Sequence, residues 1–272
     1  MSAMNNLQSP HEYLESIRPK LKAGESVDGN EYFRLLAEWN AKQPQRLFYA
    51  TIGRKPADIA EAIAGLVVKH AAELVLPAFA GDVEAAYGLC GALDNCERGA
   101  VAYAMWKARA PSAAFREYFK NAWDHDHRWV IGAAGSRAVL TRMFRYAEFV
   151  LPSHLPDTVR VWRGTSHLTR KKAQAGYSWT TDRDTACWFA MRHAKQSDRV
   201  LLLAADVPKQ DIAMYHDERD ESEAVLLTPP DSWIDGDIND WRLGCERIER
   251  RNASLMEGRM NELMEEQSKP TT

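Results

Sequence analysis

The spacing of apolar residues changes once along the chain, near residue 152. From Pro10 to about Val150, apolar residues recur every three or four positions, which is the period of an α-helix. From Thr158 to Pro230 the chain contains four segments, 158–166, 176–190, 198–207 and 217–230, bounded by Gly, Asp and Pro. Three of them alternate apolar and polar residues, which favours β-strands. The pattern predicts an α+β protein with a helical N-terminal domain (1–152), a strand-rich core (153–235) and a C-terminal helix with a tail (236–272).

The N-terminal pattern predicts a domain of about six helices. Helical spacing covers 31–43, 56–76, 81–108, 111–123 and 130–151, and the Gly-punctuated third segment could be two helices. Pro56 and Pro111 favour helix starts at these positions because proline suits the first turn. Aromatic and methionine residues in these segments are interpreted as core.

A second helical pattern occupies 241–267. Its apolar residues recur among charged ones and predict an amphipathic helix; they are Ile248, Leu255, Met256, Met260 and Leu263. We expect this helix to pack on its own chain. Packing on the N-terminal domain and binding of a partner such as an antidote protein remain alternatives. The preceding segment, 231–240, is acidic and is interpreted as turn-rich.

Two of the strand segments carry polar residues where an apolar row is expected. Side chains alternate faces along a strand, so Arg163 continues the apolar row of Val159 and Val161, and a guanidinium there needs an anionic partner. In the next segment Ser178 and Thr180 share a face and present two hydroxyls, a place to hold a ligand or another side chain.

The last strand segment opens on two carboxylates. With strict alternation, Glu221 and Glu223 lie on one face together with Val225 and Leu227. Two carboxylates this close raise the pKa of one of them, and such pairs are typical of functional sites. The segment before them, 209–220, is interpreted as a loop from which Tyr215 could contact an acceptor molecule.

Arg163, then Ser178-Trp179-Thr180, then Glu221 and Glu223 form a pattern that resembles the Arg-Ser-Glu class of mono-ADP-ribosyltransferases, which includes bacterial and phage toxins. The resemblance spans roughly 70 residues, and the order of the motifs on strands is its most specific part. The middle motif is Ser-Trp-Thr, whereas the family has Ser-Thr-Ser. The resemblance implies a split β-sandwich core and NAD as co-substrate.

The resemblance also assigns roles. Arg163 would hold the NAD phosphates, the backbone of Gly164 would meet the nicotinamide amide, and Ser178, Trp179 and Thr180 would form the hydroxyl motif, with Ser178 orienting the catalytic glutamate. Glu223 would stabilise the ribose cation, and Glu221 would orient the acceptor nucleophile. These roles agree with the chemistry of glycosidic cleavage, which needs a carboxylate beside an oxocarbenium-like sugar and a rigid hold on the anionic pyrophosphate attached to that sugar.

The function expected from this resemblance is transfer of ADP-ribose from NAD to a macromolecular acceptor with release of nicotinamide, in a toxin or effector. The acceptor could be a protein, modified at arginine, or a nucleic acid. Two alternatives stay open: an NAD glycohydrolase, in which water is the acceptor, and a catalytically silent module that binds NAD or a partner.

Composition limits the remaining possibilities. The 272 residues carry a net charge of −3, so we do not expect the surface as a whole to bind nucleic acid nonspecifically. The four cysteines are scattered without CxxC spacing, which predicts reduced thiols rather than a zinc site or a disulfide framework. No signal peptide or apolar stretch of about 18 residues is present, so we expect a cytoplasmic protein, in the producing or the target cell, with no membrane partner.

One further cluster, Asp124-His125-Asp126-His127, lies in the helical part. His125 and His127 cannot share a helix face, so we interpret the cluster as a surface turn in which the acidic residues cap helices, and we expect no metal. A loop that pairs one Asp with one His around a metal, and recognition of the acceptor, are the alternatives.

Overall fold

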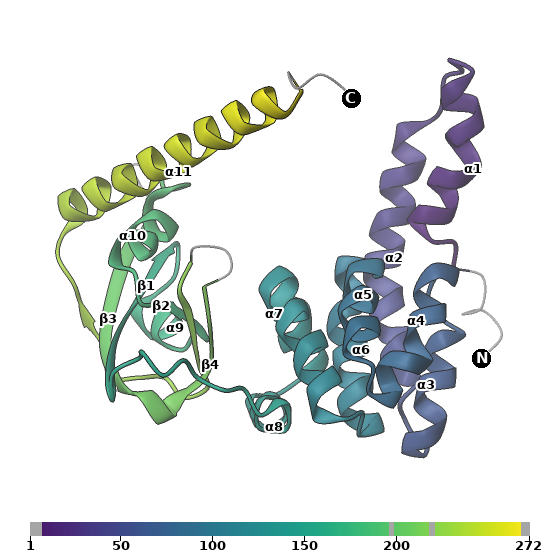
Figure 1. Ribbon diagram of the computed structural model, residues 1–272, viewed down its shortest axis with the longest axis horizontal. Helices are drawn as coiled ribbons and strands as arrows, with labels where there is room; N and C mark the ends of the chain where they lie inside the picture. Colours follow the sequence, from purple (N-terminus) through teal and green to yellow (C-terminus); the bar gives the residue numbers. More distant parts are fainter. Residues whose placement is uncertain (1–6, 196–198, 218–220, 268–272) are drawn as a thin grey trace. The chain divides into compact units, whose positions relative to one another are not determined.

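The computed structural model describes residues 7–195, 199–217 and 221–267, and for 261–267 it describes the backbone alone. The chain divides into two compact units, Met1–Glu148 and Phe149–Thr272 (Figure 1). The first unit is helical and the second contains an antiparallel sheet, so the predicted α+β class is confirmed. The predicted boundary at residue 152 lies just beyond the division between the units.

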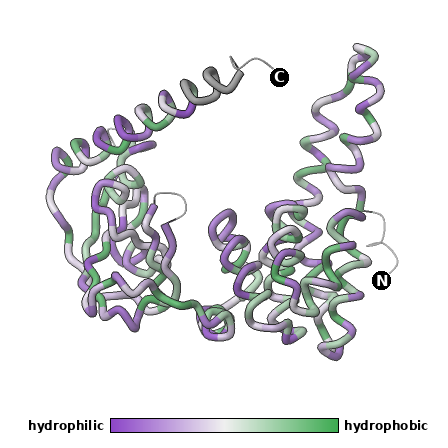
Figure 2. Tube along the Cα trace, viewed as in Figure 1, coloured by the Kyte–Doolittle hydropathy of each residue, from purple (hydrophilic) through white to green (hydrophobic). Residues whose placement is uncertain are grey.

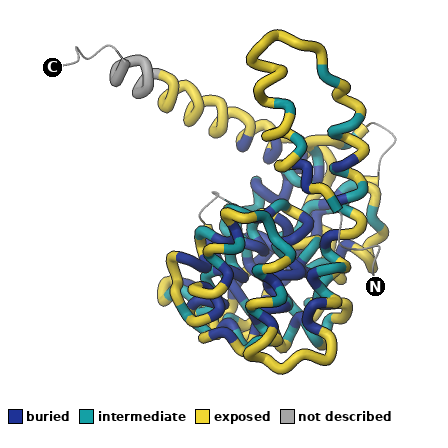
Figure 3. The backbone as a smooth tube through the Cα atoms, turned by 90° about the vertical axis from the view of Figure 1, so that its right-hand side faces the viewer, coloured by how far each residue is buried: buried dark blue, intermediate teal, exposed yellow. Residues whose placement is uncertain are grey.

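The described residues of the first unit form eight helices, two more than the approximate six expected. They are α1 (Pro10–Lys22), α2 (Gly29–Tyr49), α3 (Pro56–Ala64), α4 (Lys69–Ala80), α5 (Val83–Ala92), α6 (Asn95–Ala108), α7 (Ser112–Ala134) and α8 (Arg137–Ala147). Their core is rich in aromatic residues, and the largest fully buried side chains include Trp123, Tyr118, Phe115 and Phe119. In contrast, α1 and the start of α2 are mostly hydrophilic (Figure 2) and largely exposed (Figure 3).

Two predicted helices have different limits in the structure. The segment 56–76 is not one helix, because α3 ends at its C-cap Gly65 and α4 begins at Lys69. The segment 130–151 is also divided: Gly135 has a φ of 67°, which ends α7, and the Ser136 hydroxyl accepts from Val139 N to begin α8. A left-handed glycine followed by an N-cap serine therefore overrides the continuous helical spacing of the apolar residues.

The sheet of the second unit has the strand order β4-β5-β2-β1-β3-β6. The strands are β1 (Thr158–Ser166), β2 (Ser178–Thr180), β3 (Val200–Pro208), β4 (Ile212–His216), β5 (Glu223–Leu226) and β6 (Trp233–Ile234). β1 pairs with β3 along its whole length, whereas β1 and β2 are in register only at Trp162 and Thr180. The sheet therefore consists of two three-stranded parts joined at a narrow junction.

Two of these strands correct the sequence interpretation. Residues 212–216, expected within a loop, form β4, which pairs with β5, and residues 233–234 of the expected turn-rich segment form β6. In β4 the residues Ile212, Met214 and His216 are buried at every second position, which is strand periodicity inside a segment of mixed composition.

Each face of the sheet packs on a separate apolar cluster. Val159, Val161 and Leu203 belong to the cluster that also contains Ala173 of α9 (Arg170–Gln174). On the other face, Leu202 packs with Ala186 and Cys187 of α10 (Arg183–Met191) and with Trp241 of α11 (Ile238–Gln267).

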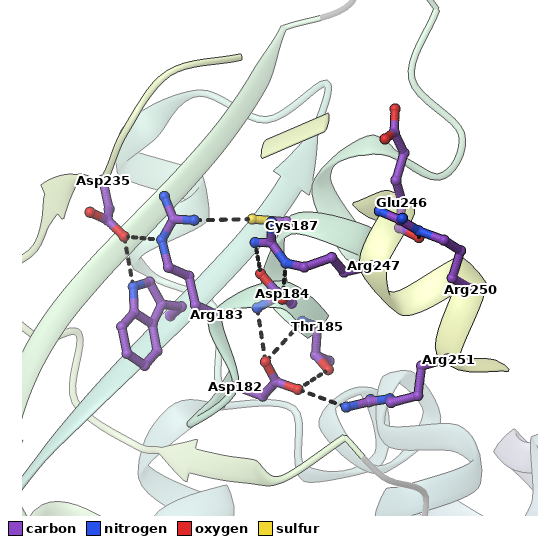
Figure 4. A network of polar contacts seen from close by, with 11 residues as sticks. Asp182, Arg183, Asp184, Thr185, Cys187, Asp235, Glu246, Arg247, Arg250 and Arg251 are labelled. Carbon is purple, nitrogen blue, oxygen red and sulfur yellow. Dashed lines mark hydrogen bonds and ion pairs between the residues drawn. The ribbon is translucent and has the colours of Figure 1, made fainter. Parts of the chain in front are cut away.

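α11 is held against α10 by a network of ion pairs (Figure 4). Arg247 forms a bidentate ion pair with Asp184, in which the Arg247 Nε lies 2.6 Å from the Asp184 Oδ2. The Arg251 Nη1 lies 3.3 Å from the Asp182 Oδ2. Arg183 binds Asp235, which also accepts from the Trp162 indole at 2.8 Å. The network joins both helices to the strand β1.

Among the residues of α11 whose side chains are described, the buried ones lie in the first half of the helix. Trp241, Cys245 and Ile248 are at most 7% exposed, so this part packs on its own chain as expected. Leu255, Met256 and Met260 are exposed, and the Leu263 side chain lies outside the described residues. Figure 3 shows this exposed part of the helix in yellow. In the described residues no helix combines the length and apolar character needed to cross a membrane. All four cysteines are free thiols and buried.

Candidate functional site

Arg163 lies at the narrow junction between the two parts of the sheet. β1 and β2 are in register at Trp162 and Thr180, and beyond this pair no further registered pair joins them. There the Arg163 Nη1 donates to the backbone carbonyl of Ser178. The guanidinium thus takes over the hydrogen-bonding role that a β1 backbone amide would have in a longer ladder.

Two glycines make this arrangement possible. A Cβ on Gly176 would collide with the Arg163 guanidinium, and a Cβ on Gly164 would collide with the Ala186 carbonyl of α10. Gly176 therefore leaves the space that Arg163 occupies, and Gly164 lets α10 lie directly on β1. The role expected for Gly164 was a backbone contact to nicotinamide; the structure shows a packing requirement at the same residue.

Arg163 keeps most of its donor capacity. A guanidinium has five N–H groups, and among the described residues only Nη1 of Arg163 has an acceptor, while Nε is buried without one. Burial lowers the pKa of the Arg163 guanidinium below its usual value, and the negative charge of Glu223 acts in the opposite direction. An anion that bound here would both satisfy donors and offset the desolvation.

The three residues of the hydroxyl motif have different environments. Trp179 is 2% exposed in the core, and its indole donates to the Gly176 carbonyl at 3.2 Å. The Thr180 hydroxyl already makes two hydrogen bonds within the protein: it donates to the Glu221 carbonyl at 2.5 Å and accepts from Asp182 N at 3.0 Å. The half-buried Ser178 has no side-chain hydrogen bond within the described part of the chain. Of the three, Ser178 is the residue whose side chain remains available to a ligand.

Glu223 is fixed by a neighbour that the sequence interpretation missed. His216 on β4 lies directly opposite Glu223 on β5, and the His216 Nε2 is 2.9 Å from the Glu223 Oε2. Both side chains are nearly buried, at 4% and 12% exposure. The alternation of Ile212, Met214 and His216 is the signal from which this pair could have been found.

The register places the site residues on two faces. Trp162, Thr180, Glu223 and His216 are paired across four neighbouring strands, so they form one row on one face. Arg163 and Trp179 belong to the next row, one residue away along their strands. Their side chains therefore lie on the other face of the sheet, which is the face of the core cluster that contains Trp179. By register Arg163 and Glu223 therefore start from neighbouring rows on opposite faces, but the Arg163 guanidinium reaches the narrow junction, where it binds the Ser178 carbonyl and the charge of Glu223 acts on it.

Glu221 is half-buried just before β5 and does not continue that strand's alternation. Ser222 between the two glutamates has a φ of 45°, a left-handed conformation that breaks the two-residue period. The prediction that Glu221 and Glu223 share a face through strand geometry is therefore not met by the backbone. The Glu221 carbonyl is instead tied to β2 through Thr180.

Tyr215, expected on a loop, lies within β4. It is partly buried against the sheet core, and its hydroxyl is 3.3 Å from the Thr181 hydroxyl. Its role in contacting an acceptor stays a prediction.

The Asp124–His127 cluster lies at a break in α7. Asp126 has a non-helical φ of −150°, and its buried carboxylate lies 2.8 Å from Arg98 Nη1. His125 Nδ1 is 2.9 Å from the Asn121 carbonyl, and the His125 side chain is exposed. The cluster is therefore not a surface turn between two helices but a break within α7, where the Asp126 carboxylate forms a buried ion pair with Arg98.

Comparisons with known proteins add no relative: no family model, no curated protein and no solved structure matches this chain.

Proposed function

We propose that the second unit is an NAD-dependent mono-ADP-ribosyltransferase, acting as a toxin or effector. One observation carries the proposal: β1, β2 and β5, which are separated in the chain, are immediate neighbours in the sheet, and their neighbouring rows hold Arg163, Ser178 and Glu223. The division of the sheet into two parts at β1 and β2 fits the split core that the family resemblance implies.

The residues present suit NAD as co-substrate. Arg163 has unused donors for a phosphate, and Ser178 has an unused hydroxyl on the face that carries Glu223. The Arg guanidinium favours phosphate because its planar fork donates two parallel hydrogen bonds. Trp179 and Thr180 serve this site through packing and backbone geometry, since both are buried.

The reaction breaks the bond between the nicotinamide nitrogen and the ribose C1′. The bonding electron pair leaves with nicotinamide, and the positive charge on the ribose is stabilised by the Glu223 carboxylate. An acceptor nucleophile then forms the new bond to C1′ and loses its proton to Glu221. His216 holds the Glu223 carboxylate in place, so little reorganisation is needed when the charge develops.

The test measures released nicotinamide and acceptor-bound label in parallel, in cell lysate supplied with labelled NAD and then separated into protein, RNA, DNA and small molecules. Glu223→Gln keeps the shape of the side chain but loses its charge. Both signals should therefore fall by a factor of about 100 or more, which is typical when one group that stabilises charge in a transition state is removed. Glu221→Gln should lose transfer and retain slow NAD hydrolysis, because water needs less orientation than a large acceptor.

Glu246→Gln on α11 is the matched control, because it makes the same charge change at an exposed residue of the same unit. Full activity of Glu223→Gln in both measurements would contradict the proposed chemistry. Nicotinamide release by the parent protein without labelled macromolecules would assign it as a hydrolase instead.

Arg163 is tested separately, since its proposed role is to bind the NAD phosphates, whereas Glu223 stabilises the charge on the ribose. Arg163→Lys keeps the charge but loses the fork, so NAD affinity should drop at least tenfold by calorimetry while the melting temperature changes little. If NAD binds equally well to a folded Arg163→Lys and a folded Arg163→Ala, then Arg163 only joins β1 to β2.

A further inference from the structure

The helical unit contains a pocket that plays no part in the proposed NAD site. It has a volume of about 430 Å³ and lies among α2, α6 and the end of α7. This volume is in the range of pockets that enclose small organic molecules. All residues that line the pocket belong to the first unit, so the pocket is formed by that unit alone.

Four aromatic side chains dominate the lining: Phe48, Tyr49, Tyr103 and Trp129. Phe48 and Tyr103 lie with their ring centroids 5.2 Å apart. Aromatic surfaces of this kind favour a flat ring, which can stack on them or meet them edge to face. The shape and chemistry of the lining therefore favour a planar ligand.

The polar groups of the pocket further limit the chemical class of ligand that it can bind. Asn40 and Gln45 contribute side-chain amides and Tyr103 a phenol, and within the described residues none of these groups has a hydrogen-bond partner. An amide offers one acceptor and two donors, which match the mixed edge of a heterocyclic base. No residue in the lining carries a formal charge, so nothing in it compensates a charged ligand.

Gly132 provides the open space. It lies in α7 and lines the pocket, and a Cβ added at this residue would meet no atom within 4 Å. Glycine inside a helix lowers its stability relative to other residues. At Gly132 the missing side chain leaves room beside the aromatic groups, and a larger residue would fill that room.

We infer that this pocket binds an uncharged, planar heteroaromatic molecule with hydrogen-bonding groups on its edge, of the size of a nucleoside. The aromatic side chains contact the faces of the ring, and Asn40 or Gln45 binds its edge. The inference does not depend on the proposed transferase activity, because the nucleosides used as probes below lack both the phosphates and the nicotinamide on which that activity acts.

The experiment titrates the full chain with adenosine, guanosine, cytidine and uridine, using ligand-detected NMR and calorimetry. At least one nucleoside should bind with a dissociation constant below about 1 mM. Gly132→Leu should weaken this binding at least tenfold, because the leucine side chain occupies the open space. Gly132→Leu is also expected to keep the fold, since leucine is a better helix former than glycine.

Gly91→Leu is the matched control. Gly91 is also helical and has open space around it, but it lies in α5 and does not line the pocket, so this variant should bind like the parent. Asn40→Leu removes one amide and should weaken binding several-fold. Absence of binding by all four nucleosides, or binding that a folded Gly132→Leu retains, would overturn the inference. Unchanged affinity in both Asn40→Leu and Gln45→Leu would overturn the assignment of a polar-edged ring.

Discussion

His216 Nε2 lies 2.9 Å from Glu223 Oε2, across the paired strands β4 and β5. Both side chains are nearly removed from water, so the contact is far stronger than the same pair would be on the surface. The pair fixes one oxygen of the Glu223 carboxylate at the start of β5. A carboxylate held in this way can stabilise a developing positive charge without first having to reorient.

Replacement of His216 should therefore affect turnover more than NAD binding. His216→Ala leaves the Glu223 carboxylate buried without this partner, and we expect nicotinamide release to fall at least tenfold with little change in KM. His216→Gln, which returns a donor close to the position of Nε2, should recover part of the loss. A His216→Ala variant with reduced stability but full turnover would show that the pair is purely structural.

Gly176→Ala should act on NAD binding through Arg163. The added methyl group would occupy the position of the guanidinium, which must then leave the Ser178 carbonyl. We expect NAD affinity to fall by about tenfold, as for loss of one charge-assisted hydrogen bond. Calorimetry of Gly176→Ala beside Gly258→Ala tests this, because a Cβ on Gly258 meets nothing within 4 Å. Equal affinities in the two variants would contradict the dependence on Arg163.

The strands that carry the candidate residues could be predicted because their composition alternates locally. β1 has the limits 158–166 expected from its sequence, and the segment 200–208 of β3 nearly matches the expected 198–207. By contrast, β4 was missed because acidic and basic residues follow it directly and make the segment resemble a loop. Its pattern is carried by three buried residues, Ile212, Met214 and His216.

Relations between strands could not be predicted in the same way. The single registered pair of Trp162 with Thr180 sets which side chains share a face, and this pairing depends on contacts far apart in the chain. The left-handed Ser222 similarly separates Glu221 from the alternation of β5, although serine gives no sequence signal for that conformation. Faces within one strand were therefore predictable from alternation, as for Ser178 and Thr180, whereas the pairing between strands and the departure of Glu221 from the alternation were not.

Glu97 predicts a pH dependence of the stability of the helical unit. It is fully buried, accepts from Gln43 at 2.9 Å and caps α6 through Asp94 N. Burial raises the pKa of Glu97 from 4.5 to about 7, against the lowering effect of the Gln43 hydrogen bond. The folded protein thus binds this proton more tightly than the unfolded chain does.

The stabilisation linked to Glu97 is complete below pH 4.5 and is lost as the pH rises to about 7. The free energy of unfolding should decrease by about 3 kcal/mol over this range because of Glu97. Glu97→Gln, which cannot ionise, should remove this decrease even if its stability is lower overall. Denaturant unfolding at a series of pH values checks the slope, with the exposed Glu73→Gln as control. An identical slope in Glu97→Gln and the parent would contradict the assignment.

Substitutions of the two hydroxyl residues of β2, Thr180 and Ser178, should have different effects: one on stability and the other on activity. Thr180 donates to the Glu221 carbonyl and accepts from Asp182 N, so Thr180→Val, which keeps the shape, leaves both backbone groups without this partner. We expect Thr180→Val to lower the free energy of unfolding by about 1–3 kcal/mol.

Ser178→Ala should give the opposite result, because the Ser178 side chain has no hydrogen bond to lose within the described residues, while its backbone carbonyl, which binds Arg163, is unchanged. Stability should stay within about 0.5 kcal/mol of the parent, as for a surface substitution. Nicotinamide release should nevertheless fall, since Ser178 shares the face of Glu223 on the adjacent strand and is the hydroxyl left to orient that carboxylate or the bound ribose.

Thermal unfolding and nicotinamide release, measured on both variants, distinguish the roles of Ser178 and Thr180. A Ser178→Ala protein with parental turnover would remove Ser178 from the site, and loss of stability in Ser178→Ala equal to that in Thr180→Val would show that both hydroxyls only support the fold.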